Sequence, residues 1–303
     1  MSQVFFSRKW DQAEKLFEAA GFDQLIAYEE LVALKIHFGE PGNTAFLRPE
    51  LVKATTERIV NLGGLPFYTD CNTLYKGPRQ NTRDHLAVAR DHGYTKERAG
   101  AESLIPEEND QAVVEVNLKH FKKVLIGGAA ARAGVILALT HFKGHDLTGF
   151  GGALKNVGMG LGTRLGKLRM HQDCENCAEA KTCRKNQTIE SCWVGSPALV
   201  QEKMVEYAWG ALLGKKAGYL NFIINVSPNC DCYPHNDPPI VPDIGVLASN
   251  DPVAIDQASV DLVNQAAKQD IFRKIYPEMD WNIQLNYAEK IGLGSRKYNL
   301  CEI

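Results

Sequence analysis

Apolar positions along this chain fall into alternating helical and strand-like patterns. Between residues 10 and 21, apolar side chains recur at helical spacing ahead of a glycine that would end the helix: Trp10, Ala13, Leu16, Phe17 and Ala20. The short apolar runs 32–38 and 66–70 are typical of buried strands, and the segments 49–62 and 81–92 are typical of helices. Because strand and helix alternate, the pattern predicts a parallel sheet with crossover helices.

The rest of the chain continues this alternation. Further strands are predicted over 113–116, 124–126, 135–140, 219–225 and 244–248, and further helices over 197–213, 251–264 and 283–291. We therefore predict an α/β fold with mostly parallel sheets, crossover helices and a Cys-rich metal-binding insert. Its parts are an N-terminal lobe (1–170), the insert (171–196) and a C-terminal lobe (197–303) that completes the fold.

Composition and charge narrow the classes of partner. The chain has 303 residues, 45% hydrophobic and 23% charged, with a formal net charge of -2. Without a basic excess, we expect it to bind neither nucleic acid nor a membrane. No apolar run approaches the roughly 20 residues that cross a bilayer, and the charged N-terminus is unlike a signal peptide. We expect a cytoplasmic protein whose partner is a small-molecule substrate or a redox protein, with an oligomeric state that the sequence does not specify.

Four of the eight cysteines fall in one polar segment without periodicity. They are Cys174, Cys177, Cys183 and Cys192, in the spacing C-x2-C-x5-C-x8-C. Disulfides are rare in a reducing cytoplasm, and four thiolates are the ligand number of both structural zinc and [4Fe–4S] sites. The spacing predicts one metal centre here, with zinc slightly favoured by spacing alone and four free thiols as the alternative.

Cys230 and Cys232 form a second, shorter motif, C-D-C, ahead of Pro234 and His235. These two thiols are candidate ligands of the same metal centre or of a separate one. A C-x-C pair in this context is also typical of a tight turn, because proline and aspartate favour turns.

Polar side chains collect where the predicted strands end. Lys35 and His37 share one face of the first strand, Asp70 ends the second, and His141 and His145 follow the strand 135–140. Ligands of open parallel sheets bind beyond the carboxyl ends of the strands. We therefore expect a site there with Lys35, His37, Asp70, His145 and Lys155 as its catalytic candidates. The alternative is that these are ordinary polar loops, with each histidine a hydrogen-bonded structural residue.

The segment 149–162 is rich in glycine but lacks the spacing of a phosphate-binding fingerprint. Its glycines serve either the close packing of a strand against a helix or the close approach of backbone to a ligand. On the second interpretation, Gly149, Gly151 and Gly152, together with His141, contact a cofactor, and Lys155 projects into the site.

Several strings together resemble the iron–sulfur-centre proteins of domain of unknown function family 362. The strings are residues 32–44, 69–77, 141–160, 166–171, 230–232 and 251–263. The resemblance runs from about Val32 to the end and implies an electron-transfer protein or reductase partner with [4Fe–4S] clusters. Many members look like this chain with a two-cluster ferredoxin module inserted after the position of His171.

The insert departs from that family pattern, since it is short and has one set of four cysteines in a different spacing. One cluster, or a zinc ion in its place, is therefore expected rather than two clusters. The C-x2-C-x5-C portion is also similar to the cluster loop of some DNA-repair glycosylases. These resemblances favour [4Fe–4S] over zinc.

The segment 145–155 is similar, more distantly, to the central motif of the nickel-pincer lactate racemases, H-x-x-x-G-F-x-G-G-x-K, with one glycine displaced. This similarity implies that His145 matches a catalytic histidine, Lys155 the lysine that carries the cofactor, and His171 the metal-binding histidine. It suggests a common scaffold and one pocket: His145, Lys155, His171, Lys35, His37 and Asp70.

The sequence therefore supports three functional hypotheses. The first is a [4Fe–4S] protein that moves electrons to or from a ligand bound at the strand ends. The second is a zinc-stabilised enzyme that performs acid–base chemistry on a small hydroxy- or carboxy-acid, with His145 as the base and Lys155 or Lys35 holding the carboxylate. The third is a non-catalytic module in which zinc rigidifies a surface for a partner protein.

Overall fold

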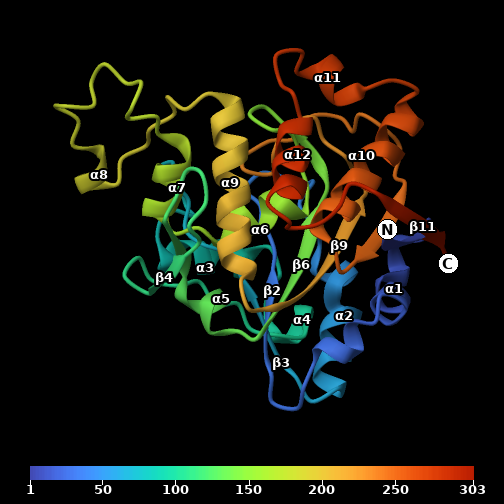
Figure 1. Cartoon of the computed structure of the whole chain (residues 1–303). Helices are drawn as coiled ribbons and strands as arrows, with labels where there is room; N and C mark the ends of the chain where they lie inside the picture. Colours follow the sequence, from blue (N-terminus) through green and yellow to red (C-terminus); the bar gives the residue numbers. More distant parts are fainter.

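Seven strands form one central sheet in the computed structural model, which describes residues 1–185 and 187–303 (Figure 1). Its strand order is β11-β1-β10-β9-β6-β2-β3; β10 is antiparallel to both of its neighbours, and the other pairs are parallel. The bounds are β1 Ser2–Ser7, β2 Leu31–Lys35, β3 Leu65–Thr69, β6 Val135–His141, β9 Lys216–Ile223, β10 Gly245–Ser249 and β11 Tyr298–Glu302. A mixed α/β fold with a mostly parallel sheet is thus confirmed.

Two small antiparallel ladders lie outside this sheet. They are β4 (Gln111–Glu115) with β5 (Lys123–Gly127), and β7 (Lys143–His145) with β8 (Gly149–Gly151). The sequence pattern correctly predicts strands near β4 and β5. The predicted ranges 1–170 and 197–303 both contribute strands to the central sheet, since β6 pairs directly with β9.

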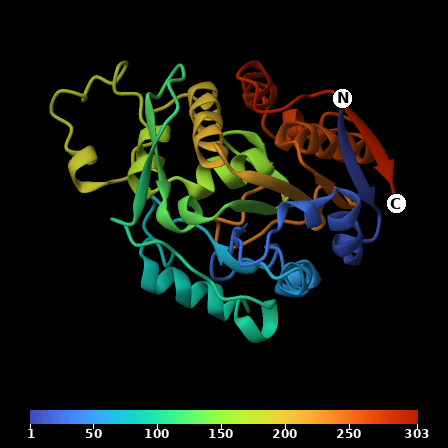
Figure 2. The ribbon, with the colours of Figure 1, turned by 60° about the horizontal axis from the view of Figure 1, so that its bottom comes forward.

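Helices cover both faces of the sheet (Figures 1 and 2). The first group is η1 Trp10–Gln12, α1 Ala13–Ala19, η2 Phe22–Leu25, α2 Pro49–Asn61, α3 Thr82–Asp91, α4 Lys96–Ala99 and α5 Gly128–Arg132. The second group is α6 Ala153–Leu161, α7 Arg164–His171, α8 Lys185–Thr188, α9 Pro197–Leu212, α10 Pro252–Ala267, α11 Ile271–Ile275 and α12 Asn282–Lys290. Among the described residues, no helix has both the length and the apolarity that a membrane crossing requires.

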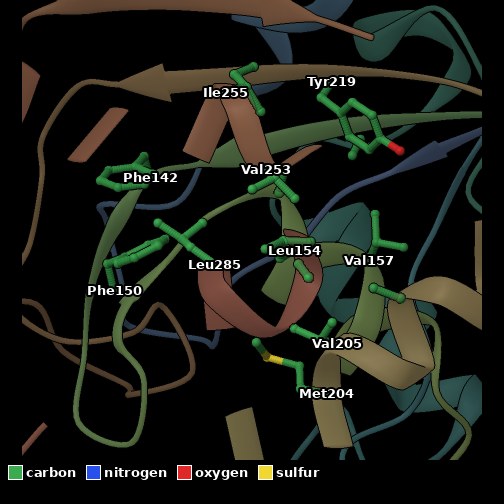
Figure 3. Close-up of a cluster of buried hydrophobic side chains, with 14 of the residues drawn as sticks. Phe142, Phe150, Leu154, Val157, Met204, Val205, Tyr219, Val253, Ile255 and Leu285 are labelled. Carbon is green, nitrogen blue, oxygen red and sulfur yellow. The ribbon is translucent and has the colours of Figure 1, made fainter. Parts of the chain in front are cut away.

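Alternation along the strands divides the interior into two cores. Ile136 of β6 faces the core shared with α6, α9, α10 and α12, whereas Val135 and Leu137 face the core shared with α1 and α2. Figure 3 shows the first core, where Leu154 of α6, Val205 of α9 and other apolar side chains converge. Because both faces are covered, the central strands read as continuous apolar runs in the sequence.

Helix α6 is fixed tightly between its neighbours. A Cβ atom at Gly158 would overlap the carbonyl oxygen of Met204, so this glycine lets α6 approach α9 closely. At the start of α6, the buried carboxylate of Asp256 accepts hydrogen bonds from the backbone N–H groups of Ala153 and Leu154, at 2.7 and 2.9 Å. Burial raises the pKa of Asp256 to about 6. These contacts determine where Lys155, on the first turn of α6, projects.

Candidate functional site

A cavity of about 510 Å³ opens at the carboxyl ends of the parallel strands. The predicted site residues that line it are Lys35, His37, Asp70, His141, His145, Gly151, Gly152, Lys155, His171, Cys230 and Cys232. They come from segments far apart in the sequence, brought together because parallel strands end at one edge of the sheet. The four cysteines of the insert are not among the lining residues.

Gly149 does not line the cavity either, although the sequence predicts a cofactor contact there. Its φ angle is +74°, and a Cβ atom at this position would lie 2.7 Å from the Cβ of Trp281. Glycine at position 149 therefore allows a left-handed backbone conformation and close packing against Trp281. This agrees with the alternative that the glycines of this segment serve close packing. Gly151 and Gly152, two and three residues later, do reach the cavity wall.

A buried ion pair forms one part of the wall. Lys35 Nζ lies 3.2 Å from Asp70 Oδ1 and donates a 2.7 Å hydrogen bond to Asn156 Oδ1 on α6. Burial lowers the pKa of Lys35 to about 8, with the Asp70 charge opposing this shift. Burial would raise the pKa of Asp70, but the Lys35 charge and the other cations around it hold it well below its usual range.

Sequence reasoning missed Arg79, which lines the cavity beside this pair. Its Nε donates to Glu40 Oε1 at 3.0 Å, and its Nη1 lies 3.6 Å from Asp70 Oδ2. The Nη1 atom has no hydrogen-bond partner among the described residues. Arg79 and Glu40 lie in the loops that follow the first two predicted strands, so their position at the strand ends was the available signal.

The hydrogen bonds of two histidines determine where each holds its proton. His37 Nδ1 accepts from the backbone N–H of Gly39, and His145 Nδ1 accepts from that of Leu147, each at 3.1 Å. The neutral imidazole in each case therefore carries its proton on Nε2. Burial lowers the pKa of both rings, which keeps them neutral. His145 is thus arranged as a hydrogen-bond donor through Nε2, and its expected role as a general base stays a prediction.

The C-D-C motif forms a tight turn, one of the alternatives that the sequence left open. The backbone N–H of Tyr233 donates to the carbonyl of Cys230 at 3.1 Å, which closes the turn. Between the two cysteines, the buried Asp231 carboxylate accepts a 2.6 Å hydrogen bond from Lys143 Nζ and lies 2.9 Å from His141 Nδ1. Asp231 and Lys143 were not predicted as site residues, although both lie in strings that the sequence analysis singled out.

His141 holds the C-D-C turn in place. Its Nδ1 faces Asp231, and its Nε2 lies 2.9 Å from the carbonyl oxygen of Ile224. Both ring nitrogens are therefore engaged within the described structure. His141 also lines the cavity, so its predicted cofactor contact stays a prediction. The physical role that the structure gives His141 is to anchor the buried carboxylate at the centre of the C-D-C turn.

Cys230 lies in the most polarised part of the cavity. Its Sγ lies 3.6 Å from Lys155 Nζ. The neighbouring Cys232 thiol, together with the Lys155 charge and His145, holds the pKa of Cys230 well below its usual range, against the opposing effect of burial. The same neighbour, Cys230, and burial raise the pKa of Cys232 well above its usual range. Of the two thiols, Cys230 is therefore the more readily deprotonated.

Two cavity lysines have no carboxylate within salt-bridge distance in the described structure. Lys155 contacts the Cys230 sulfur, and Lys167 Nζ donates to the carbonyls of Gly162 and Cys71 at 2.8 and 3.2 Å. Both side chains are buried or nearly so, and both line the cavity. Buried cations without a carboxylate partner favour an anionic ligand, because such a ligand would restore the lost solvation.

The Cys-rich insert protrudes from the body beside α7 (Figures 1 and 2). His171 and Trp193, near its two ends, line the cavity. The backbone N–H of Gly195 donates to the carbonyl of His171 at 2.8 Å, and this bond joins the two ends of the insert. Trp193 contacts the His171 ring edge-on, with 4.4 Å between ring centroids, and both side chains line the cavity. Burial lowers the pKa of His171 to about 3, so its imidazole is neutral, as metal ligation requires.

Cys174 lies within electrostatic range of the other three insert cysteines. The pKa of Cys174 is raised by partial burial and by the thiols of Cys192, Cys183 and Cys177. Four neighbouring thiols are a donor set that fits either a [4Fe–4S] cluster or zinc. Within the described residues, no three His, Cys, Asp or Glu side chains lie close enough to ligate one ion. Their convergence on one metal therefore stays a prediction.

The model of the family described as Domain of unknown function (DUF362) matches residues 32–261. The chain belongs to the DUF362 family. The resemblance drawn from the sequence motifs is confirmed to that extent, and the match includes every strand end that contributes to the cavity. No curated protein matches this DUF362 protein.

Two solved structures are similar to this DUF362 protein. The lactate racemase apoprotein from Thermoanaerobacterium thermosaccharolyticum has 13% identity and a TM-score of 0.47, covering 74% of this chain and 51% of that one. A structural-genomics crystal structure of a protein from Thermotoga maritima has 11% identity and a TM-score of 0.46, covering 84% of this chain and 59% of that one. This chain thus spans between half and three fifths of the length of each.

Proposed function

We propose that this DUF362 protein is an enzyme that binds a small carboxylate-bearing acid in the cavity and performs redox chemistry on it with a metal centre held by the insert. The single observation that carries the proposal is the pair of the half-buried Lys155 and the buried Lys167, which line the cavity without a carboxylate partner among the described residues. A carboxylate placed between them would receive charge-assisted hydrogen bonds from both.

The cavity residues would divide the remaining work. The Nε2–H of His145 would donate to an oxygen of the bound acid, since its Nδ1 is occupied by the Leu147 amide. The Lys35–Asp70 pair would hold a proton close to neutral pH, because the pKa of Lys35 is about 8. Trp193 would cover the bound molecule on the side of the insert.

The metal centre is supported by the donor set and by the place of the insert. Cys174, Cys177, Cys183 and Cys192 would hold a [4Fe–4S] cluster, with zinc as the alternative. A cluster, when bound, supplies single electrons, whereas zinc has no redox chemistry and would only stabilise the structure of the insert. Redox coupling to the cavity is supported because His171 and Trp193, at the two ends of the insert, both line it.

Binding of small carboxylates tests the first half of the proposal. We would titrate the anaerobically purified protein with a panel of short hydroxy- and dicarboxylic acids by calorimetry. Lys155→Met should weaken binding by about 10- to 100-fold, the loss of one charge-assisted hydrogen bond. Lys181→Met, on the exposed surface of the insert, is the matched control and should bind as the wild type does. Equal affinities for Lys155→Met and wild type, or no binding by any member of the panel, would refute a carboxylate site.

Metal analysis tests the second half. Anaerobic protein should be brown, contain iron and sulfide, and lose both in the double variant Cys174→Ser/Cys177→Ser. A colourless protein with stoichiometric zinc would overturn the redox proposal. That result would leave the second hypothesis, a zinc-clipped enzyme without redox chemistry, in which the same double variant loses stability but keeps residual turnover.

A further inference from the structure

The C-D-C turn brings two thiols together at the cavity wall. Residues 230–233 are closed by the hydrogen bond from the Tyr233 amide to the Cys230 carbonyl, so Cys230 and Cys232 occupy the first and third positions of a β-turn. A turn brings these positions closer than an extended strand does, into the Cα separation that a disulfide requires. Both sulfur-bearing residues line the cavity.

The central residue of the motif, Asp231, anchors the turn. The Asp231 carboxylate is fully buried and held by Lys143 and His141. The backbone N–H of Glu40 donates to the Asp231 carbonyl at 3.0 Å and ties the turn to the loop after β2. Because the middle of the turn is anchored, the two flanking cysteines keep their places relative to each other and to Lys155.

We propose that Cys230 and Cys232 form a redox-active dithiol that reduces small disulfides bearing carboxylate groups. This activity goes beyond the proposed function and requires neither the insert nor a metal. Lys155 supports the choice of substrate class in two ways. Its Nζ lies 3.6 Å from the Cys230 sulfur, where its charge stabilises a thiolate nucleophile, and its remaining N–H donors are available to a carboxylate next to the reacting sulfur.

The reaction balances without another reactant. The Cys230 thiolate attacks one sulfur of the substrate disulfide, a mixed disulfide forms, and the first substrate thiolate leaves with the electron pair of the broken S–S bond. Cys232 then loses its proton and attacks the Cys230 sulfur, which forms the Cys230–Cys232 disulfide and releases the second thiolate. The substrate gains two electrons and the protein dithiol loses them. A dithiol reductant such as dithiothreitol restores the reduced protein.

Cys71 provides an internal control in the same cavity. It also lines the wall, but burial raises its pKa to about 11, and its Sγ lies 3.4 Å from the carbonyl oxygen of Leu161. Cys71 should therefore remain an unreactive thiol under conditions in which Cys230 reacts. The two sites are read separately, because trypsin releases Cys71 in the peptide 59–76 and the C-D-C motif in the peptide 217–268.

The test uses dithiobis(nitrobenzoate), an aromatic disulfide with one carboxylate on each ring, and the intact folded chain. Peptide mass spectrometry of the wild type should show an internal disulfide in 217–268, with 59–76 unmodified. Cys232→Ser should instead trap a single thionitrobenzoate on Cys230, because the second step has lost its attacking thiol. An intact wild type that keeps both thiols reduced, or carries a mixed disulfide on each, would overturn the proposal.

Substrate class is tested with the same peptide readout. Lys155→Met should slow the reaction of dithiobis(nitrobenzoate) by at least about tenfold, and that of uncharged dithiodipyridine clearly less. Equal slowing of both reagents would overturn the role of the carboxylate. If only the dithiol proposal is wrong, the wild type still binds the carboxylate panel in the calorimeter. If only the carboxylate site is wrong, the internal disulfide still forms with dithiodipyridine. The two proposals therefore fail separately.

Discussion

The stability of the fold should fall at acidic pH because of His85, a fully buried residue of α3 next to Asp70. Its Nδ1 lies 3.1 Å from Asn72 Oδ1, and its Nε2 lies 3.9 Å from Asp70 Oδ2 without a hydrogen-bond partner among the described residues. Burial lowers the pKa of His85 to about 3 from the ordinary 6.5, although the Asp70 charge opposes the shift. We predict that His85→Asn makes the protein less sensitive to acid.

The magnitude follows from proton linkage. Because the pKa of His85 is lower in the folded state, the unfolded chain binds more protons between pH 6.5 and about 3. The stability from neutral His85 is therefore fully present above pH 6.5 and is lost as the pH falls. Each pH unit in this window removes about 1.4 kcal/mol, so acidification from about pH 7.5 to about pH 4.5 removes about 2.7 kcal/mol through this one residue.

Urea unfolding at the two pH values measures this loss. His85→Asn keeps an N–H donor towards Asn72 but cannot titrate, so its free energy of unfolding should fall about 2.7 kcal/mol less than that of the wild type. Val88→Ala, a cavity-forming change at a buried position of the same helix, is the matched control. It should lower the stability by the same amount at both pH values. Equal losses on acidification for wild type and His85→Asn would refute the reasoning.

Three further predictions concern the packing that positions the cavity. Gly158→Ala should lower the free energy of unfolding, measured in urea, by about 3 kcal/mol, because the added Cβ would push α6 away from α9. Gly77→Ala is the control: a Cβ there would make only ordinary van der Waals contacts, so it should cost less than about 1 kcal/mol. Asp256→Ala should cost about 3 kcal/mol or more by thermal unfolding, since it leaves the Ala153 and Leu154 amides without acceptors; unchanged stability would contradict this account. Asp231→Asn should lower the stability by about 3 kcal/mol in the same thermal assay, because the buried Lys143 charge loses its partner. Adding Lys143→Met to this variant should recover part of the lost stability.

The helix and strand pattern could be predicted from local sequence because each element has its own signal. The apolar runs of β2 and β6 are buried on both faces of the sheet, and Pro49, Pro197 and Pro252 stand at the starts of helices. The terminal strands β1 and β11 carry no comparable signal. They pair Ser2 with Tyr298 across almost the whole chain, and such a long-range pairing leaves no periodicity in either partner.

The sequence by itself determined which chemistry collects at the strand ends, because Lys35, Asp70 and His145 lie within, at the end of or a few residues after apolar runs that form buried strands. Only the tertiary structure decided what each group does there. The Leu147 amide determines which ring nitrogen of His145 carries the proton. Asp231 and its buried partner Lys143 hold the C-D-C turn in place, and Lys155 Nζ lies 3.6 Å from the sulfur of Cys230. Hydrogen bonds and charges act through space at a few ångströms, so their effects depend on neighbours that a linear pattern does not specify.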